Sequence, residues 1–154
     1  MRKIVLDSNA FILYLAGLVN KNQIGNYARK SDWNSEDFHY LCEIINEEEC
    51  DIITTPNVLT ETDNILNRIS GDDKYKYLYL VKNIYLKSIE EYIKSEEASN
   101  EGFFDQLGLA DSVVLKVAQR SDLLISADSE LCRYAEALNI KLVDLTKNKA
   151  RQYE

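Results

Sequence analysis

The sequence contains a single histidine, His39, and three cysteines that are scattered along the chain. One histidine excludes a histidine-rich metal centre and weakens any assignment as a Ser-His-Asp hydrolase. Cys42, Cys50 and Cys132 include no Cys-x-x-Cys pair, so neither a disulfide framework nor a thiolate zinc site is expected. The three thiols are predicted to be structural, two or three of them buried, in a reducing compartment.

The chain also has no long apolar run, since its longest runs are only a few residues and a bilayer span needs about 20. Met1, Arg2 and Lys3 resemble a signal-peptide start, but residues 7–9 are polar and interrupt the apolar stretch before any cleavage pattern. A cytoplasmic location without a membrane partner is therefore expected. No repeat, low-complexity tract or linker divides the chain, which predicts one domain over residues 1–154.

Basic residues are few: 18 Lys and Arg stand against 26 Asp and Glu, giving a net charge of −8. This excess of acid argues against nonspecific binding of nucleic acid through a broad basic surface. It does not exclude a nuclease, because site carboxylates contribute to the total and bound divalent ions offset them locally. Phosphate contacts should then be few and local, or supplied by a partner.

Short apolar strands alternate with helical patterns along the chain. The predicted strands cover residues 4–6, 51–55, 123–127 and 140–145, and the predicted helices cover 9–19, 35–49, 56–70, 109–120 and 129–138. Strands that alternate with helices imply right-handed crossovers and a parallel sheet, which is an α/β fold. A polar tail is expected after residue 145.

Residues 72–94 form a further helical pattern that is dense in tyrosine. Its tyrosines are Tyr75, Tyr77, Tyr79, Tyr85 and Tyr92. Such side chains could stack on unpaired bases, although packing at a core edge or a dimer face is the commoner use. Residues 95–108 are predicted to be an acidic loop or short turn.

Four acids stand where separate elements could bring them to one edge of the sheet. Asp7 and Asp128 each end a predicted strand, and open α/β sheets bind ligands at the carboxyl ends of their strands. Asp111 lies in the first turn of a helix, and Glu61 has the longer reach from another. Hard carboxylate oxygens suit Mg²⁺ or Mn²⁺, and one or two such ions can generate hydroxide and stabilise a leaving oxygen.

Each acid also has a purely structural interpretation. Asp7 and Asp128 could cap the helices that follow them, Asp111 could favour a helix N-terminus through the dipole, and Glu61 could be solvated. Any one acid alone favours that interpretation. The ordered set of four favours a metal site.

The ordered motifs resemble those of the PIN-domain ribonucleases, a family that includes the toxins of bacterial toxin–antitoxin pairs. The resemblance lies in residues 4–9 (IVLDSN), 55–61 (TPNVLTE), 107–112 (LGLADS) and 124–131 (LISADSEL). It implies a PIN-like three-layer α/β/α fold with a central parallel sheet of four to five strands. The tyrosine-rich middle is longer than in the compact toxins of this family.

Residue by residue, the resemblance places Asp7, Glu61, Asp111 and Asp128 at the family's catalytic, metal-binding acids, with Asn9 and Ser126 in support. It implies Mg²⁺- or Mn²⁺-dependent endoribonuclease activity on single-stranded or structured RNA, with one or two ions. An antitoxin and a second copy of the chain are the protein partners it suggests. In this reading, Asp7, Asp111 and Asp128 hold the metal, while Glu61 holds a second ion or orients the attacking water.

Three other functions fit parts of the pattern. A phosphohydrolase could use Asp7 as its nucleophile, but Asn9 replaces the aspartate expected as general acid. A phospho-receiver shares the acidic strand ends, but it also requires a lysine at the end of its last strand. In this chain, Lys141 lies at the beginning of the last predicted strand instead. A catalytically inactive PIN-like domain could instead bind protein partners through the tyrosine-rich helix.

Overall fold

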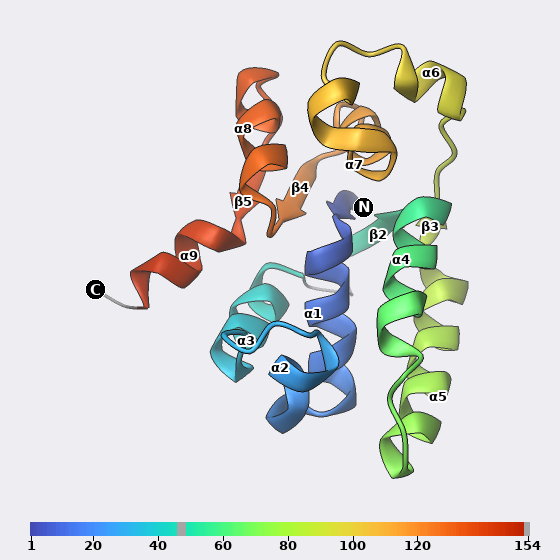
Figure 1. The fold of residues 1–154 in the computed structure, drawn as a ribbon, viewed down its shortest axis with the longest axis vertical. Coiled ribbons are helices and arrows are strands. Elements are labelled where there is room, and N and C mark those ends of the chain that lie inside the picture. The colour runs from blue at the N-terminus through green and yellow to red at the C-terminus, as the bar shows by residue number, and fades with distance from the viewer. Residues whose placement is uncertain (46–48, 153–154) are drawn as a thin grey trace.

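In the computed structural model, which describes residues 1–45 and 49–152, five parallel strands form one sheet in the order β3-β2-β1-β4-β5 (Figure 1). The strands are β1 (Arg2–Leu6), β2 (Cys50–Thr54), β3 (Ile89–Glu90), β4 (Leu123–Ser126) and β5 (Leu142–Asp144). Every pair of neighbours is parallel. The predicted α/β class and the parallel sheet of four to five strands are therefore confirmed.

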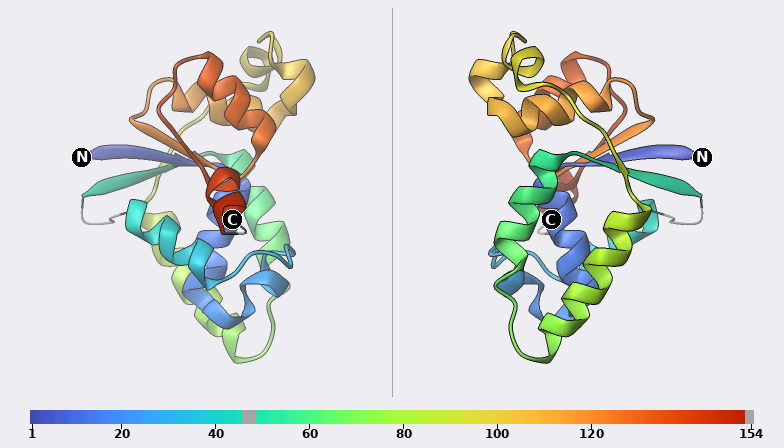
Figure 2. Two further views of the ribbon diagram at one scale, coloured as in Figure 1. Left: turned by 90° about the vertical axis from the view of Figure 1, so that its left-hand side faces the viewer. Right: turned by 90° about the vertical axis from the view of Figure 1, so that its right-hand side faces the viewer.

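Helices cover both faces of this sheet, giving three layers. The helices are α1 (Ser8–Val19), η1 (Lys21–Gln23), α2 (Ile24–Tyr27), α3 (Ser35–Ile44), α4 (Pro56–Leu66), α5 (Asp72–Lys87), α6 (Ser95–Ser99), α7 (Phe104–Ala118), α8 (Ser129–Ala137) and α9 (Leu145–Arg151). Figure 2 shows α7 and α8 on one side of the sheet, and α1, α3, α4 and α5 on the other. Within the described residues, no helix is both long and apolar enough to cross a membrane.

The central strand β1 is buried on both faces. Its residues Ile4, Val5 and Leu6 are at most 1% exposed, as expected for a parallel strand between two helical layers. β1 pairs with β2 on one side and with β4 on the other, so its carboxyl end lies in the middle of the sheet edge. Any side chain that follows Leu6 is thereby placed between two neighbouring strand ends.

Three strand-to-helix joins are fixed by side chains that cap the following helix. Asp7 accepts a hydrogen bond from the Ala10 amide at the start of α1, and Thr55 accepts one from the Val58 amide at the start of α4. Pro56 occupies the first turn of α4, where a missing N–H costs little. Asp128 caps α8 in the same way. These caps set where each helix leaves the sheet edge.

The structure corrects the predicted helix over residues 72–94. α5 ends at Lys87, and Ile89 and Glu90 form the edge strand β3, which pairs with β2. A strand of two residues is too short to show an alternating pattern, and its apolar residue fits the helical period equally well. The acidic stretch 95–108 also contains α6 and the first turn of α7 rather than only a loop.

The predicted polar tail is wrong as well, because residues 145–151 form α9. Leu145 and Lys149 are buried there, and Lys149 donates to Asp37 of α3 across 2.9 Å. The helix predicted over residues 35–49 ends at Ile44, and residues 46–48 lie outside the described part of the chain. Leu109, the first residue of the helix predicted over residues 109–120, is 39% exposed.

Candidate functional site

Asp7 lies at the carboxyl end of β1 and is the most deeply buried of the four predicted acids. Its side chain is 2% exposed and accepts three hydrogen bonds. Oδ1 accepts the Ala10 amide at 2.8 Å, while Oδ2 accepts the Ser126 hydroxyl at 2.5 Å and the Ala127 amide at 3.1 Å. A carboxylate has about four lone-pair positions, so one position on Oδ1 remains for a ligand.

Ser126 links Asp7 to Asp128. Its hydroxyl donates to Asp7 and accepts the Asp128 amide at 3.0 Å, so one buried side chain fixes both strand-end acids. Asp128 then uses its own Oδ1 to accept the Leu131 amide at 3.0 Å, at the start of α8. Asp7 and Asp128 thus do cap helices, as their structural interpretation required, and they also lie at the same edge.

Asp111 comes to this edge because the backbone turns sharply just before it. Gly108 has φ +77° and ψ −178°, a conformation that side chains with a Cβ rarely adopt, and it divides α7 into two segments. The second segment starts next to Leu109, which places Asp111 in its first turn. Leu107 and Leu109, on the two sides of the glycine, both line the pocket described below.

Glu61 projects from α4 and is exposed, but one of its oxygens is held. Oε2 accepts the hydroxyl of Ser8 at 2.8 Å, and Ser8 itself is 7% exposed. Ser8 follows Asp7 directly, so the turn between β1 and α1 positions two of the four acids. Asn9, the next residue, also lines the pocket.

All four acids line one pocket of about 320 Å³. Its remaining lining residues are Ser8, Asn9, Leu107, Leu109 and Ala110. Among the described residues, no Lys, Arg or His lines this pocket, so nothing on its wall neutralises the carboxylates. The structure therefore brings together Asp7, Glu61, Asp111 and Asp128, which come from four separate parts of the chain.

Two of these acids, Asp7 and Asp111, have raised pKa values because they are buried and lie near other acids. Burial raises the pKa of Asp7 from 3.8 to about 6; its hydrogen bonds to Ser126, Ala10 and Ala127 lower the value, and the charge of Asp128 raises it. Burial also raises the pKa of Asp111 from 3.8 to about 7, with further contributions from Asp128, Asp7 and Glu61. The four acids therefore interact electrostatically, and a bound cation would relieve their repulsion.

The donor set fits a hard divalent cation in its chemistry, since it offers carboxylate oxygens in a pocket whose described lining residues include no basic side chain. It is not a closed coordination shell: among the described residues, no group of three or more His, Cys, Asp or Glu side chains lies close enough to hold a metal ion. Mg²⁺ commonly keeps several waters and uses only one or two carboxylates directly. A hydrated ion contacts further carboxylates through its waters, so it does not require a closed shell of side chains.

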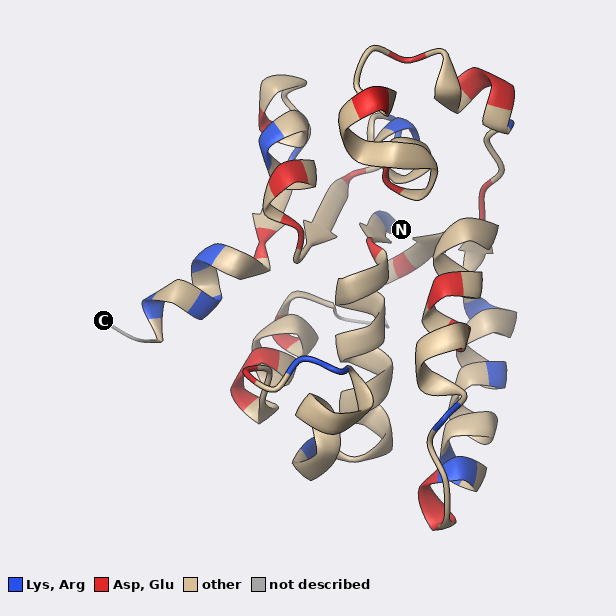
Figure 3. Ribbon diagram, in the orientation of Figure 1, with Lys and Arg blue, Asp and Glu red and all other residues tan. Residues whose placement is uncertain are grey.

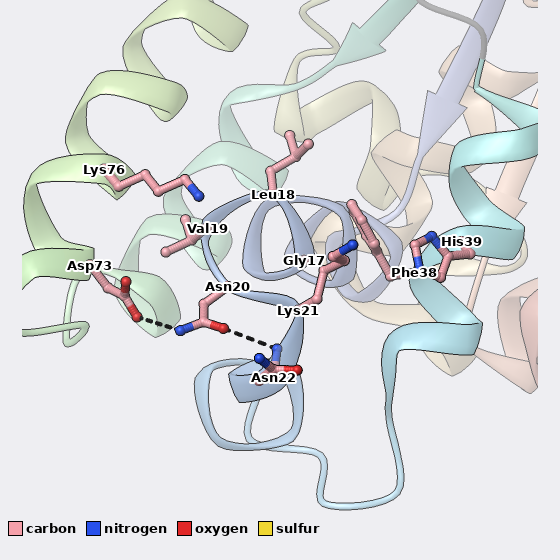
Figure 4. A pocket seen from close by; sticks show the side chains of 10 residues that line it. All are labelled: Gly17, Leu18, Val19, Asn20, Lys21, Asn22, Phe38, His39, Asp73 and Lys76. Carbon is pink, nitrogen blue, oxygen red and sulfur yellow. Dashed lines mark hydrogen bonds between the residues drawn. The ribbon is translucent and has the colours of Figure 1, made fainter.

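A different pocket, of about 490 Å³, lies at the carboxyl end of α1 between α3 and α5 (Figure 4). Its polar side chains largely satisfy one another: Asn20 donates to Asp73 at 3.0 Å and accepts the Asn22 amide at 3.0 Å. Lys21 and Lys76 bring positive charge to the end of α1, where it complements the helix dipole. These contacts account for the pocket as part of the fold.

The structure places the four predicted acids and Asn9 at one pocket and Ser126 against Asp7, but the sequence did not predict the contacts that orient the acids. Ser8 was not singled out, although its hydroxyl holds Glu61, and the contribution of the Ala127 amide could not be read from a side-chain pattern. The serine directly after a strand-end acid was the one available signal for Ser8. The apolar wall formed by Leu107 and Leu109 depends on the backbone angle at Gly108 and has no signature beyond that glycine.

Comparison with known proteins adds no identification to this geometry. No protein-family model matches the chain, and no curated protein matches it in sequence. The fold and the acidic pocket are therefore the observations on which a function must be argued.

Proposed function

We propose that the chain is a metal-dependent endoribonuclease of the PIN-domain type, which hydrolyses phosphodiester bonds in single-stranded or structured RNA. One observation carries the proposal: four carboxylates from four parts of the chain line a single pocket that has no basic side chain among its described lining residues. Structural caps alone would not require Glu61 and Asp111 to face the same space as Asp7 and Asp128. A shared cation gives all four acids one role.

In this proposal, Asp7, Asp111 and Asp128 would hold a hydrated Mg²⁺ or Mn²⁺ ion, directly or through its waters, and Glu61 would hold a second ion or orient the attacking water. A bound ion would supply Lewis acidity and lower the pKa of a water nucleophile. The chain's own residues keep the acids in place. Ser126 and the Ala127 amide hold one oxygen of Asp7, and Ser8 holds one oxygen of Glu61.

A cytoplasmic toxin role belongs to the same proposal. In that role the chain would have an RNA substrate and an antitoxin as protein partner, and a second copy of the chain is a further candidate partner. A small gene immediately upstream would favour the toxin role. Its absence would favour another role for the same nuclease chemistry.

The direct test is cleavage of a labelled single-stranded RNA by the full chain with Mn²⁺ or with EDTA. Wild-type protein should cleave only with Mn²⁺, and Asp7→Asn should lower the rate about 100- to 1,000-fold, by analogy with the loss of one group that stabilises a transition state. Asp32→Asn, which changes an exposed acid, is the matched control and should cleave like wild type. Equal activity of wild type and Asp7→Asn would indicate a contaminating nuclease.

The alternative is a PIN-like domain that only binds protein partners. It is favoured by the caps that Asp7 and Asp128 provide and by the lack of a closed coordination shell among the described residues. Under this alternative, the wild-type chain neither cleaves RNA nor binds Mn²⁺. Either positive result would count against it.

A further inference from the structure

The outer face of α5 presents an unusual stripe of exposed side chains. Tyr75, Tyr79, Lys82 and Leu86 follow one another at spacings of four, three and four residues, which places them along one side of a helix. Tyr75 is 77% exposed, Tyr79 70% and Leu86 85%, and Lys82 is exposed too. From the rise of an α-helix, the stripe is about 16 Å long. The opposite side of α5 packs into the protein.

The charge of α5 differs from that of the chain as a whole. Residues 74–87 contain Lys74, Lys76, Lys82 and Lys87 and no acid, whereas the complete sequence carries a net charge of −8. Figure 3 shows these basic positions along α5, with acidic residues confined to the first turn of the helix. None of the salt bridges among the described residues includes a lysine of α5. Lys76 interacts electrostatically with Asp73 in the first turn, whereas Lys82 and Lys87 make no salt bridge among the described residues.

The composition of the stripe distinguishes between possible occupants. Tyrosine is enriched at protein interfaces, but lysine is depleted there, and Lys82 lies in the middle of the stripe. A second copy docked face to face about a two-fold axis would bury Lys82 of both copies in one interface. Unpaired nucleic acid, in contrast, combines flat bases that stack on aromatic rings with phosphates that attract lysine.

We propose that single-stranded RNA binds along the outer face of α5, with bases on Tyr75 and Tyr79 and phosphates near Lys82 and Lys87. That the strand is RNA rests on the proposed function, because stacking and charge alone would also accept single-stranded DNA. This face would supply the few, local phosphate contacts expected from so acidic a chain.

The position of α5 makes this face a binding surface separate from the acidic pocket. α4 and α5 both pack against α1, on the same side of the sheet in Figure 2, and the Tyr77 hydroxyl of α5 donates to Asp63 of α4 at 2.9 Å. Glu61 lies on the same helix as Asp63, so α4 stands next to both regions. Changes on the outer face of α5 should therefore weaken RNA binding without changing the chemistry at the acids.

The test is fluorescence anisotropy of a labelled single-stranded RNA of about 16 nucleotides, with the full chain in EDTA so that metal-dependent cleavage cannot occur. Tyr75→Ala and Tyr79→Ala should each weaken binding about tenfold, while Tyr79→Phe, which keeps the ring, should bind like wild type. Lys82→Glu should weaken binding and lower the salt dependence by about 0.7 in the slope of log K against log salt for a lost phosphate contact. The same sequence as a duplex should bind at least tenfold more weakly.

Lys141→Glu is the control, because it makes the same charge change at an exposed lysine before β5. Equal weakening by Lys82→Glu and Lys141→Glu, or no effect of the tyrosine substitutions in variants that melt like wild type, would overturn the proposal. So would unchanged RNA binding together with loss of a dimer in the tyrosine variants, which would make the face an interface between copies.

Two outcomes separate this inference from the proposed function. If wild type and the α5 variants all cleave RNA with metal and have equal KM, the result would support the nuclease proposal and contradict the α5 binding surface. If RNA binding depends on Tyr75, Tyr79 and Lys82 but no metal-dependent cleavage occurs, the result would support the α5 binding surface and contradict the nuclease proposal. If both hold, Lys82→Glu should raise KM and leave kcat unchanged.

Discussion

Two buried aspartates, Asp37 and Asp7, have opposite surroundings. Asp37 of α3 is 1% exposed and faces a cation: Lys149 donates to Oδ2 at 2.9 Å, and Gln152 donates to Oδ1 at 2.8 Å. Asp7 is 2% exposed, but its hydrogen-bond donors are neutral and its charged neighbours are acids. Burial is therefore nearly equal, and charge compensation is what differs.

The difference separates a structural acid from a candidate functional one. At Asp37 the fold supplies the opposite charge and uses the pair to hold α9 against α3. At the acidic pocket the described residues supply no opposite charge, so Asp7 and Asp111 keep raised pKa values. An uncompensated group in a pocket is a better candidate for function than a compensated one.

The largest expected effect comes from breaking the compensated pair. Lys149→Met should destabilise the protein by about 3–5 kcal/mol, because it leaves the Asp37 charge buried without its cation. Chemical unfolding monitored by circular dichroism gives the change in the free energy of unfolding. Lys147→Met is the matched control on the same helix: its pair with Glu136 is exposed to solvent, so a much smaller loss than for Lys149→Met is expected. Equal losses in the two variants would show that burial of the Lys149 pair has no special weight.

A smaller effect is expected from supplying the missing charge at the pocket. Mn²⁺ at about 100 times its dissociation constant should stabilise wild type by about 2.7 kcal/mol and Asp7→Asn by clearly less. The stabilisation should grow between pH 6 and pH 8, because Asp7 and Asp111 must lose protons with pKa values of about 6 and 7 before they bind a cation well. Thermal melting of wild type and of Asp7→Asn, each with and without Mn²⁺, measures both effects. The same melting midpoint in all four samples would contradict the metal site.

The smallest effect should follow from removing one of the uncompensated charges. The folded-state pKa of Asp111 is about 7, above its ordinary value of 3.8. Between these two pH values the folded protein therefore holds a proton that the unfolded chain releases. Stability from this group is complete below pH 4 and is lost as pH rises to 7. Asp111→Asn should therefore stabilise the metal-free protein by about 1–2 kcal/mol at pH 8, after allowance for partial exposure, and by almost nothing at pH 4.

Urea unfolding in EDTA at both pH values measures this difference. A stabilisation by Asp111→Asn that is the same at pH 4 and pH 8 would trace to packing and not to charge.

The parts of the fold that could be predicted are those fixed by local chemistry. The strand predicted over residues 4–6 lies within β1, and the helix predicted from residue 56 begins at Pro56, where Thr55 provides the cap. α9 escaped prediction because its stability depends on the distant pair between Lys149 and Asp37. Composition alone made that segment look like a solvated tail.

The candidate site also has features that the sequence could predict and features that it could not. The order of Asp7, Glu61, Asp111 and Asp128 along the chain was enough to predict that they share one edge of a parallel sheet. The hydrogen bond from Ser8 to Glu61 depends on how α1 and α4 pack, and no spacing rule encodes it. Metal binding and RNA cleavage stay predictions until the measurements above are made.

Gly108 influences how much water reaches the acidic pocket, and therefore the local dielectric around Asp111. Its φ of +77° sends Leu107 and Leu109 to the same pocket as Asp111, and these apolar side chains help to keep water from that carboxyl. Space for a Cβ exists at this position, so a substitution would act through the backbone angle and not through a clash. The residue with no side chain thereby controls how strongly an acid three positions later responds to its charged neighbours.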